Sequence, residues 1–195
     1  MNPLSQAAPR PGLAPLALGA RPLTVQIAAV LLGTLILAIS SQISVPMIPV
    51  PVTMQTLAVT LIGALYGWRL GAITITAWLF EAALGLPVLA NGNGSLLSFV
   101  GPTAGYLFAF PIVGALVGWL VERGWNGSRP SLAFVAMLIG NALCLVFGAL
   151  WLSTLIGVEK AILAGVLPFL IGGVLKSALG AAILVAFERG RKRAA

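Results

Sequence analysis

Histidine is absent from this chain of 195 residues, and cysteine occurs once, as Cys144. Without histidine the chain lacks the commonest general base and the commonest metal ligand of proteins. A single cysteine excludes an internal disulfide and any cysteine-rich metal site. The composition therefore predicts that the chain is not an enzyme and that it holds no metal or other cofactor.

Charge is scarce as well: 8% of the residues are charged and only four are acidic, while 59% are apolar. Soluble domains carry about 25% charged residues, so this composition predicts a membrane protein. The length suits a single bundle of about six helices of roughly 20 residues each. The predicted fold class is an all-α membrane protein with six transmembrane helices.

Apolar runs and the breaks between them locate these helices. Three prolines between Val45 and Val52 forbid a continuous helix there, and Thr53 is expected to cap the helix that follows. A polar loop from Asn91 to Ser95 forms a later break. The expected spans are residues 24–44, 54–67, 70–86, 103–121, 131–152 and 162–187. The expected organisation is a flexible cytoplasmic tail (1–22), one six-helix transmembrane domain (23–189) and a basic cytoplasmic tail (190–195).

The basic residues orient the bundle in the membrane. Nine of the eleven lie in the two tails and in the loops after the second and fourth spans, whereas only Lys160 lies on the opposite side. The positive-inside rule therefore places both termini in the cytoplasm. The net charge of +7 is explained by this topology, so no nucleic-acid partner is expected.

Lys176 lies in the last apolar run, with no acidic residue within ten positions on either side. A charge at membrane depth costs about 3 kcal/mol or more, so it needs a partner or a function. Helix geometry places Lys176 about 12 Å and Glu81 about 9 Å below the outer ends of their spans. Two interpretations follow. Glu81 and Lys176 form a structural ion pair, or they line an outward-open pocket in which Lys176 binds an anionic ligand.

Residues 172–177, GGVLKS, superficially suggest a phosphate-binding loop. A Walker sequence needs glycine directly before the lysine, and Leu175 stands there instead. No ATPase site is predicted, so another subunit must hydrolyse ATP if ATP drives transport.

Small and aromatic residues near the span ends have two interpretations each. Ala29 and Gly33 form a small-xxx-small pair, which permits close helix contact inside the bundle or with another membrane subunit. Gln55, Trp78 and Tyr106 lie near the outer ends of their spans. Aromatic side chains there usually anchor a helix at the lipid headgroups, and the alternative is a contact with ligand.

Four segments together resemble the BioY family, with compatible spacing from about residue 24 to 188. They are residues 50–57 (VPVTMQTL), similar to its PVPxTxQTL segment; Glu81 with residues 85–88 (GLPV), similar to the end of its third helix; residues 101–107 (GPTAGYL), similar to its GPTGGYL signature; and Pro168 to Lys176, similar to its last-helix motif.

The resemblance implies the biotin-capturing S component of an energy-coupling factor (ECF) transporter, in the bacterial cytoplasmic membrane. Such a subunit has an outward-facing vitamin site, and it works with a transmembrane coupling subunit and two cytoplasmic ATPase subunits. The chain departs from the family in two places. Gly173 stands where an Asp is common, and Asn91 and Asn93 stand where Gly or Ser is usual.

Biotin has a carboxylate, a ureido ring and an apolar thioether ring, which suit a pocket with one cation, several amides and aromatic walls. The hypothesis is that Lys176 neutralises the carboxylate or bonds the ureido oxygen. The other expected contacts are polar ones from Asn91, Asn93, Gln55 and Thr103, packing by Trp78 and Tyr106, and Glu81, which fixes Lys176 or accepts from a ureido N–H.

A rival hypothesis is a stand-alone ion- or proton-coupled secondary transporter of a small anion, with Glu81 as its protonatable group. Inverted repeats would support this class, and the sequence shows none. A structural membrane subunit without ligand is the third possibility, and it leaves Lys176 unexplained.

Overall fold

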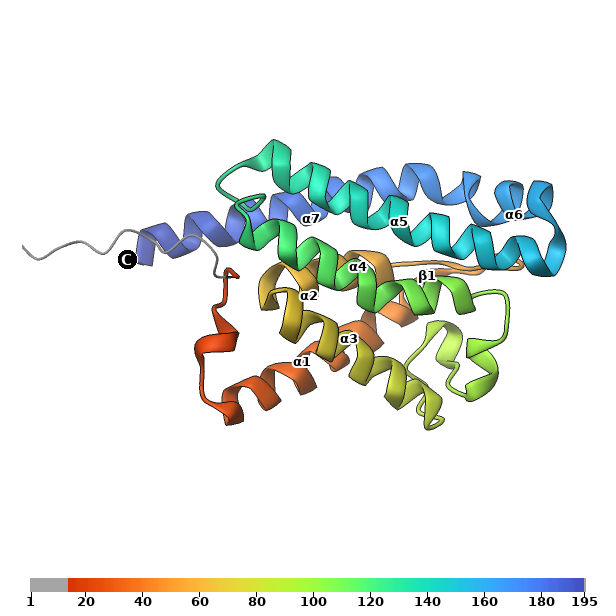
Figure 1. The fold of residues 1–195 in the computed structure, drawn as a ribbon, viewed down its shortest axis with the longest axis horizontal. Helices are drawn as coiled ribbons and strands as arrows, with labels where there is room; N and C mark the ends of the chain where they lie inside the picture. The colour runs from red at the N-terminus through yellow and green to blue at the C-terminus, as the bar shows by residue number, and fades with distance from the viewer. Residues whose placement is uncertain (1–13, 195) are drawn as a thin grey trace, which may run out of the picture.

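The computed structural model describes residues 14–194, most of which are helical (Figure 1). The α-helices are α1 (Leu23–Gln42), α2 (Gln55–Tyr66), α3 (Trp68–Ala83), α4 (Ala104–Glu122), α5 (Pro130–Ile156), α6 (Val158–Gly165) and α7 (Leu167–Ala194). The short 3₁₀ helices are η1 (Leu18–Ala20), η2 (Ala90–Gly92) and η3 (Leu96–Phe99). Two strands, β1 (Ser44–Val45) and β2 (Val52–Thr53), pair antiparallel.

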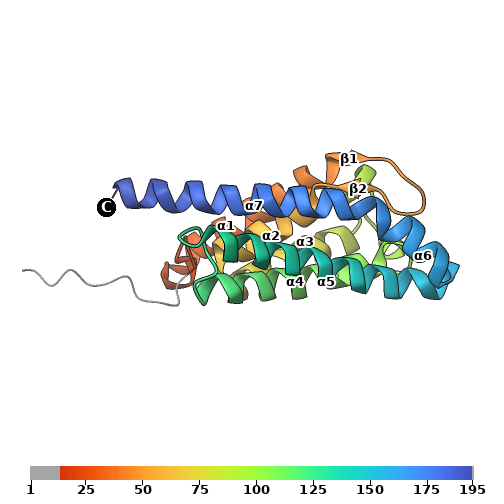
Figure 2. The same cartoon turned by 90° about the horizontal axis from the view of Figure 1, so that it is seen from above.

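The helices run roughly along one common axis, with α4 in the middle of the bundle (Figure 1). α4 packs against α2, α3 and α5; α1 packs against α3, and α7 packs against α5. Figure 2 shows α7 as one long helix along the side of the molecule. Within the described residues, α1, α4, α5 and α7 are long and apolar enough to cross a membrane. Large apolar side chains also cover the outside of the bundle, as a bilayer requires.

The expected count of six helices is not confirmed, because the last predicted span divides. α6 ends at Gly165 and α7 begins at Leu167, with Val166 in a non-helical conformation between them. Pro168 has no backbone N–H to donate into the preceding turn, which explains why α6 cannot continue through it. α7 then runs on through Ala194, so residues 190–194 of the expected basic tail are its last turns.

Part of the predicted N-terminal tail is packed against the bundle. The Leu16 N–H donates to the Leu65 carbonyl at 3.3 Å, and Leu18 is buried. Of the flexible tail expected over residues 1–22, residues 14–18 thus contact the bundle, residues 19–22 are exposed, and residues 1–13 lie outside the described residues.

The proline-rich break forms a hairpin rather than an irregular loop. Ser44 pairs with Thr53 and Val45 with Val52, so the three prolines lie in the connection between the strands. The expected cap is also different: Met54 is the residue that precedes α2, and Thr53 belongs to β2. The Thr53 hydroxyl still accepts a hydrogen bond from the Gln55 N–H, at 3.3 Å.

Ala29 and Gly33 face the inside of the bundle. A Cβ atom on Gly33 would lie 2.5 Å from Thr74 Cγ2 and 3.1 Å from the Tyr66 ring. The Ala29 carbonyl accepts a hydrogen bond from the Tyr66 hydroxyl at 2.9 Å. Internal packing, one of the two interpretations of this pair, therefore accounts for the buried Gly33 and the half-buried Ala29. Docking of a partner subunit at this pair stays a prediction.

Glycines also bring α2 and α4 into backbone contact. A Cβ atom on Gly63 would collide with the Gly114 carbonyl, and one on Gly118 would lie 2.6 Å from the Gly63 carbonyl oxygen. No side chain fits between the two helices here. This contact fixes α2 against α4, and both helices carry residues of the cavity described below.

Gly63→Ala is expected to destabilise the protein by about 1–3 kcal/mol, because the added methyl group must push the two backbones apart. Thermal unfolding in detergent measures the effect as a lower Tm. Gly172→Ala is the matched control, since a Cβ atom at that helical glycine meets nothing within 4 Å. Equal Tm values for the two variants would contradict close α2–α4 packing.

Candidate functional site

A cavity of about 530 Å³ opens at one end of the bundle. The segment from Met47 to Thr56, the loop before α4, and the helices α4, α5 and α7 form its walls. It lies beside the first turns of α4, whereas Arg123 follows the opposite end of that helix. Six of the eight predicted site residues line it: Lys176, Asn91, Asn93, Gln55, Thr103 and Tyr106.

Lys176 reaches from α7 to the start of α2. Its Nζ donates to the Thr53 carbonyl at 2.5 Å and to the Thr56 hydroxyl at 3.3 Å. Both acceptors are neutral, and no acidic residue lines the cavity within the described part of the chain. The partial positive charge of the α2 N-terminus adds to that of the ammonium group. The cavity therefore has a positively charged wall without an acidic side chain beside it.

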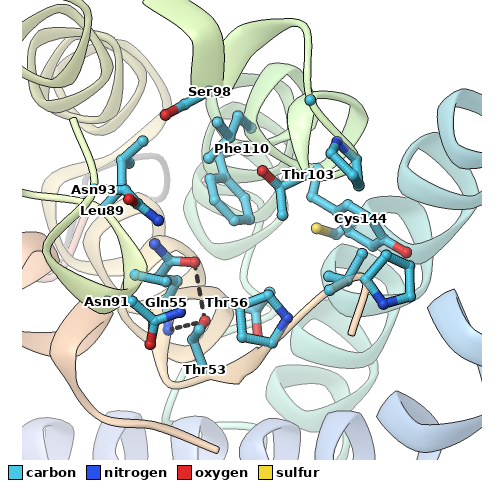
Figure 3. Close-up of a pocket in the computed structure, with 18 of the residues that line it drawn as sticks. Thr53, Gln55, Thr56, Leu89, Asn91, Asn93, Ser98, Thr103, Phe110 and Cys144 are labelled. Carbon is cyan, nitrogen blue, oxygen red and sulfur yellow. Dashed lines mark hydrogen bonds between the residues drawn. The ribbon is translucent and has the colours of Figure 1, made fainter. Parts of the chain in front are cut away.

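A short hydrogen-bond chain fixes Gln55 on the wall beside Lys176 (Figure 3). The Thr53 hydroxyl donates to Gln55 Oε1 at 2.9 Å, and Gln55 Nε2 donates to the Ser41 hydroxyl at 3.0 Å. The strand β2 thus serves the site twice, because Thr53 holds Gln55 by its side chain and Lys176 by its carbonyl.

The loop between α3 and α4 brings Asn91 and Asn93 to the cavity wall, on the same side as Gln55 in the view of Figure 3. Asn91 has a φ of 59°, a left-handed conformation that asparagine adopts more readily than most residues. Its Oδ1 accepts from the Ser44 hydroxyl at 3.3 Å. The Asn93 carbonyl accepts from the Leu89 N–H at 2.9 Å, which closes the turn.

Tyr106 forms an aromatic wall whose hydroxyl is already bonded. The hydroxyl donates to the Gly165 carbonyl at 2.7 Å, and the ring stacks on Phe169 with centroids 6.2 Å apart. The ring also lies so close to Gly148 that a side chain there would collide with it. Tyr106 therefore offers a fixed apolar face to the cavity.

The structure does not bring Trp78 and Glu81 to the cavity. Trp78 is fully buried behind Phe110, with ring centroids 5.9 Å apart, and its Nε1 donates to the Val88 carbonyl at 3.0 Å. Among the described residues the single salt bridge joins Arg191 to Glu188, so the expected Glu81–Lys176 ion pair is absent. Equal depth in the membrane says nothing about which helices are neighbours, and α3 packs on α1, α2 and α4.

Gly173, which stands where an Asp is common in the family, belongs to a neutral hydrogen-bond network. The Gly173 carbonyl accepts from the Ser177 hydroxyl at 2.7 Å, and Asn141 Nδ2 donates to that hydroxyl at 3.1 Å. This network supplies no negative charge, so Lys176 keeps an uncompensated positive charge.

Sequence reasoning missed several lining residues, notably Thr56, Phe110, Cys144 and Phe169. Helical spacing contained a signal for two of them. Phe110 follows Tyr106 by about one turn and Phe169 precedes Lys176 by about two turns, so each pair shares one helix face. Thr56 adjoins Gln55, while Cys144 has no such signal.

An apolar helical bundle with a partly polar cavity at one end defines a multi-pass membrane protein with a candidate ligand site. A family model described as the BioY family matches residues 12–193. The chain belongs to the BioY family.

Curated relatives bear names of transporters. A biotin transporter BioY of Rhizobium etli is 38% identical over 85% of this chain and 92% of its own length. A probable biotin transporter BioY of Pyrococcus horikoshii is 33% identical over 78% of this chain and 90% of its own length. The fold resembles a crystal structure of the S-component for biotin from an ECF-type ABC transporter. The TM-score is 0.71 and the identity 26%, over 87% of this chain and 95% of that one.

Lys176→Met is expected to leave the ligand-free protein as stable as the unmodified one or more stable. The substitution removes a partly buried charge that has only neutral partners, and methionine retains an apolar stem of similar length. The measurement is Tm in detergent without ligand, with Lys160→Met, a change of an exposed lysine on α6, as the control. A Tm that falls by more than about 5 °C, roughly 1 kcal/mol or more, would contradict this account of Lys176.

Proposed function

We propose that this protein captures biotin outside the cell and mediates its uptake across the bacterial cytoplasmic membrane as the substrate-binding subunit of an ECF-type ABC transporter. The observation that carries the proposal is the cavity with Lys176, a cation without a carboxylate partner. The names of the relatives and of the similar crystal structure supply the identity of the ligand.

Lys176 binds the biotin carboxylate in this proposal. An ammonium group has three N–H donors, and Thr53 and Thr56 accept from two of them. The third donor remains for the ligand. A bond from the ammonium group to a carboxylate joins two oppositely charged groups, whereas a bond to the ureido oxygen has only one ionised partner. The carboxylate also neutralises the ammonium charge. The carboxylate is therefore a better partner for Lys176 than the ureido oxygen.

The remaining walls suit the rest of the molecule. The ureido ring has N–H donors and a carbonyl acceptor, and the side chains of Gln55, Asn91, Asn93 and Thr103 offer both acceptors and donors. The thioether ring and the alkyl chain pack against Tyr106 and its aromatic neighbours. The volume of about 530 Å³ lies within the range of small-molecule sites, roughly 300–1,000 Å³.

The basic residues at one end of the bundle give the proposed orientation of the protein in the membrane. Arg123, Arg129 and the basic end of α7 lie away from the cavity, and the positive-inside rule makes their side cytoplasmic. The cavity then opens outward. The sequence contains no Walker motif, so in this proposal another subunit hydrolyses ATP. The resemblance to the BioY family implies that two cytoplasmic ATPase subunits do so and act through a transmembrane coupling subunit. No observation favours the stand-alone transporter, since Glu81 lies outside the cavity.

Lys176→Met is expected to weaken biotin binding at least 100-fold, because the variant loses a charge-assisted bond at a partly buried site, worth about 3 kcal/mol. Isothermal titration of the detergent-purified protein measures the Kd, and Lys160→Met is the control.

Biotinamide, in which a neutral amide replaces the carboxylate, separates the two possible contacts of Lys176. The unmodified protein should prefer biotin to biotinamide strongly, and Lys176→Met should bind the two equally. A preference that persists in Lys176→Met would show that the lysine contacts the ureido group instead.

Glu81→Gln is expected to change neither the biotin Kd nor biotin uptake by more than about twofold, because Glu81 does not line the cavity. Uptake of labelled biotin by cells measures the second quantity. The same assay in cells without the ATPase subunits should show no accumulation. Accumulation there that requires both Glu81 and a proton gradient would support the rival transporter class.

A further inference from the structure

Gln42, the last residue of α1, lies outside the cavity and bonds the loop of residues 87–93. This segment, which carries Asn91 and Asn93, is the asparagine loop. Its Nε2 donates to the Leu89 carbonyl at 3.0 Å and lies 3.5 Å from the Pro87 carbonyl. Its Oε1 accepts from the Gly92 N–H at 3.1 Å. One side-chain amide thus bonds the loop on both sides of Asn91. Gln42 itself does not line the cavity.

Two further side chains bond this loop: Trp78 of α3 donates to the Val88 carbonyl at 3.0 Å, and Ser44 of β1 donates to Asn91 Oδ1 at 3.3 Å. Trp78 is buried behind the cavity wall, whereas Gln42 is exposed at the end of α1. Trp78 and Gln42 hold the neighbouring backbone carbonyls of Val88 and Leu89 from two different helices. With the Ser44–Asn91 bond, these contacts fix the position of the loop at the cavity.

Ser41, the residue before Gln42, holds another polar side chain of the cavity, that of Gln55. The Ser41 hydroxyl is fully buried and accepts from Gln55 Nε2 at 3.0 Å. Successive residues at the end of α1 therefore hold Gln55 and the asparagine loop in fixed relative positions. A polar site whose side chains are held before the ligand arrives loses less ordering free energy on binding.

We infer that Gln42 is a positioning residue of the ligand site: it orders the loop of residues 87–93 so that Asn91 and Asn93 face the bound molecule. The inference rests on the proposed biotin site for its binding consequence, but the ordering of the loop is a property of the ligand-free protein. Because Gln42 is exposed, water competes for its bonds, and the expected loss of affinity without it is about tenfold.

The test replaces Gln42 by methionine, which keeps the length of the side chain and removes its donor and acceptor. Gln26→Met is the matched control, because Gln26 lies on the same helix and donates to the Arg21 carbonyl at 2.9 Å, away from the cavity. Amide hydrogen exchange over residues 87–94 is measured without ligand, and the biotin Kd is measured by titration. Gln42→Met should speed exchange in this loop and weaken binding about tenfold, with Tm unchanged, and Gln26→Met should do neither.

A double-mutant cycle separates positioning from a general loss of stability. If Gln42 acts through the loop amides, Gln42→Met should weaken biotin binding far less in a protein that already carries Asn91→Ala and Asn93→Ala. Unchanged loop exchange, an unchanged Kd, or fully additive losses would each overturn the inference. Failure of the unmodified protein to bind biotin would overturn the proposed function, and the exchange measurement would then still decide whether Gln42 orders the loop.

Discussion

The ammonium group of Lys176 lies in an apolar helical bundle and bonds only the carbonyl of Thr53 and the hydroxyl of Thr56. Several features of the fold serve this contact. The hairpin brings Thr53 to the start of α2, the glycine contact fixes α2 against α4, and α7 carries the lysine to the same place. These neutral acceptors take hydrogen bonds from the ammonium group but do not cancel its charge. Among the described residues that line the resulting cavity, Lys176 is basic and none is acidic.

Hydropathy and charge were sufficient to predict a membrane protein and the approximate positions of α1, α4, α5 and α7, the described helices that are long and apolar enough to cross a membrane. They place residues along the membrane normal, because helix length converts directly into depth. They do not specify neighbours around the bundle. Glu81 and Lys176 were therefore expected to meet at similar depth, yet no ion pair joins them. The hairpin was missed because each strand has two residues, too few for an alternating pattern.

The site was predictable where one motif carried several of its residues. Gln55, Thr103 and Tyr106 belong to segments that resemble family motifs, and the cavity contains all three. Trp78 was assigned to the ligand because it is aromatic and near a span end, but its indole N–H holds the Val88 carbonyl instead. Gln42 could not be found from sequence, since its role depends on a loop almost 50 residues away that folds back onto the end of α1.

The neutral network beside Gly173 has a consequence for the energetics of transport. With a carboxylate ligand next to Lys176, the occupied site carries no net charge, whereas the empty site carries one positive charge. The membrane potential acts on each elementary charge with about 2.3 kcal/mol per 100 mV. Under the proposed function, movement of the loaded site through the bilayer would be electrically silent, and the potential would act only on the return of the empty site.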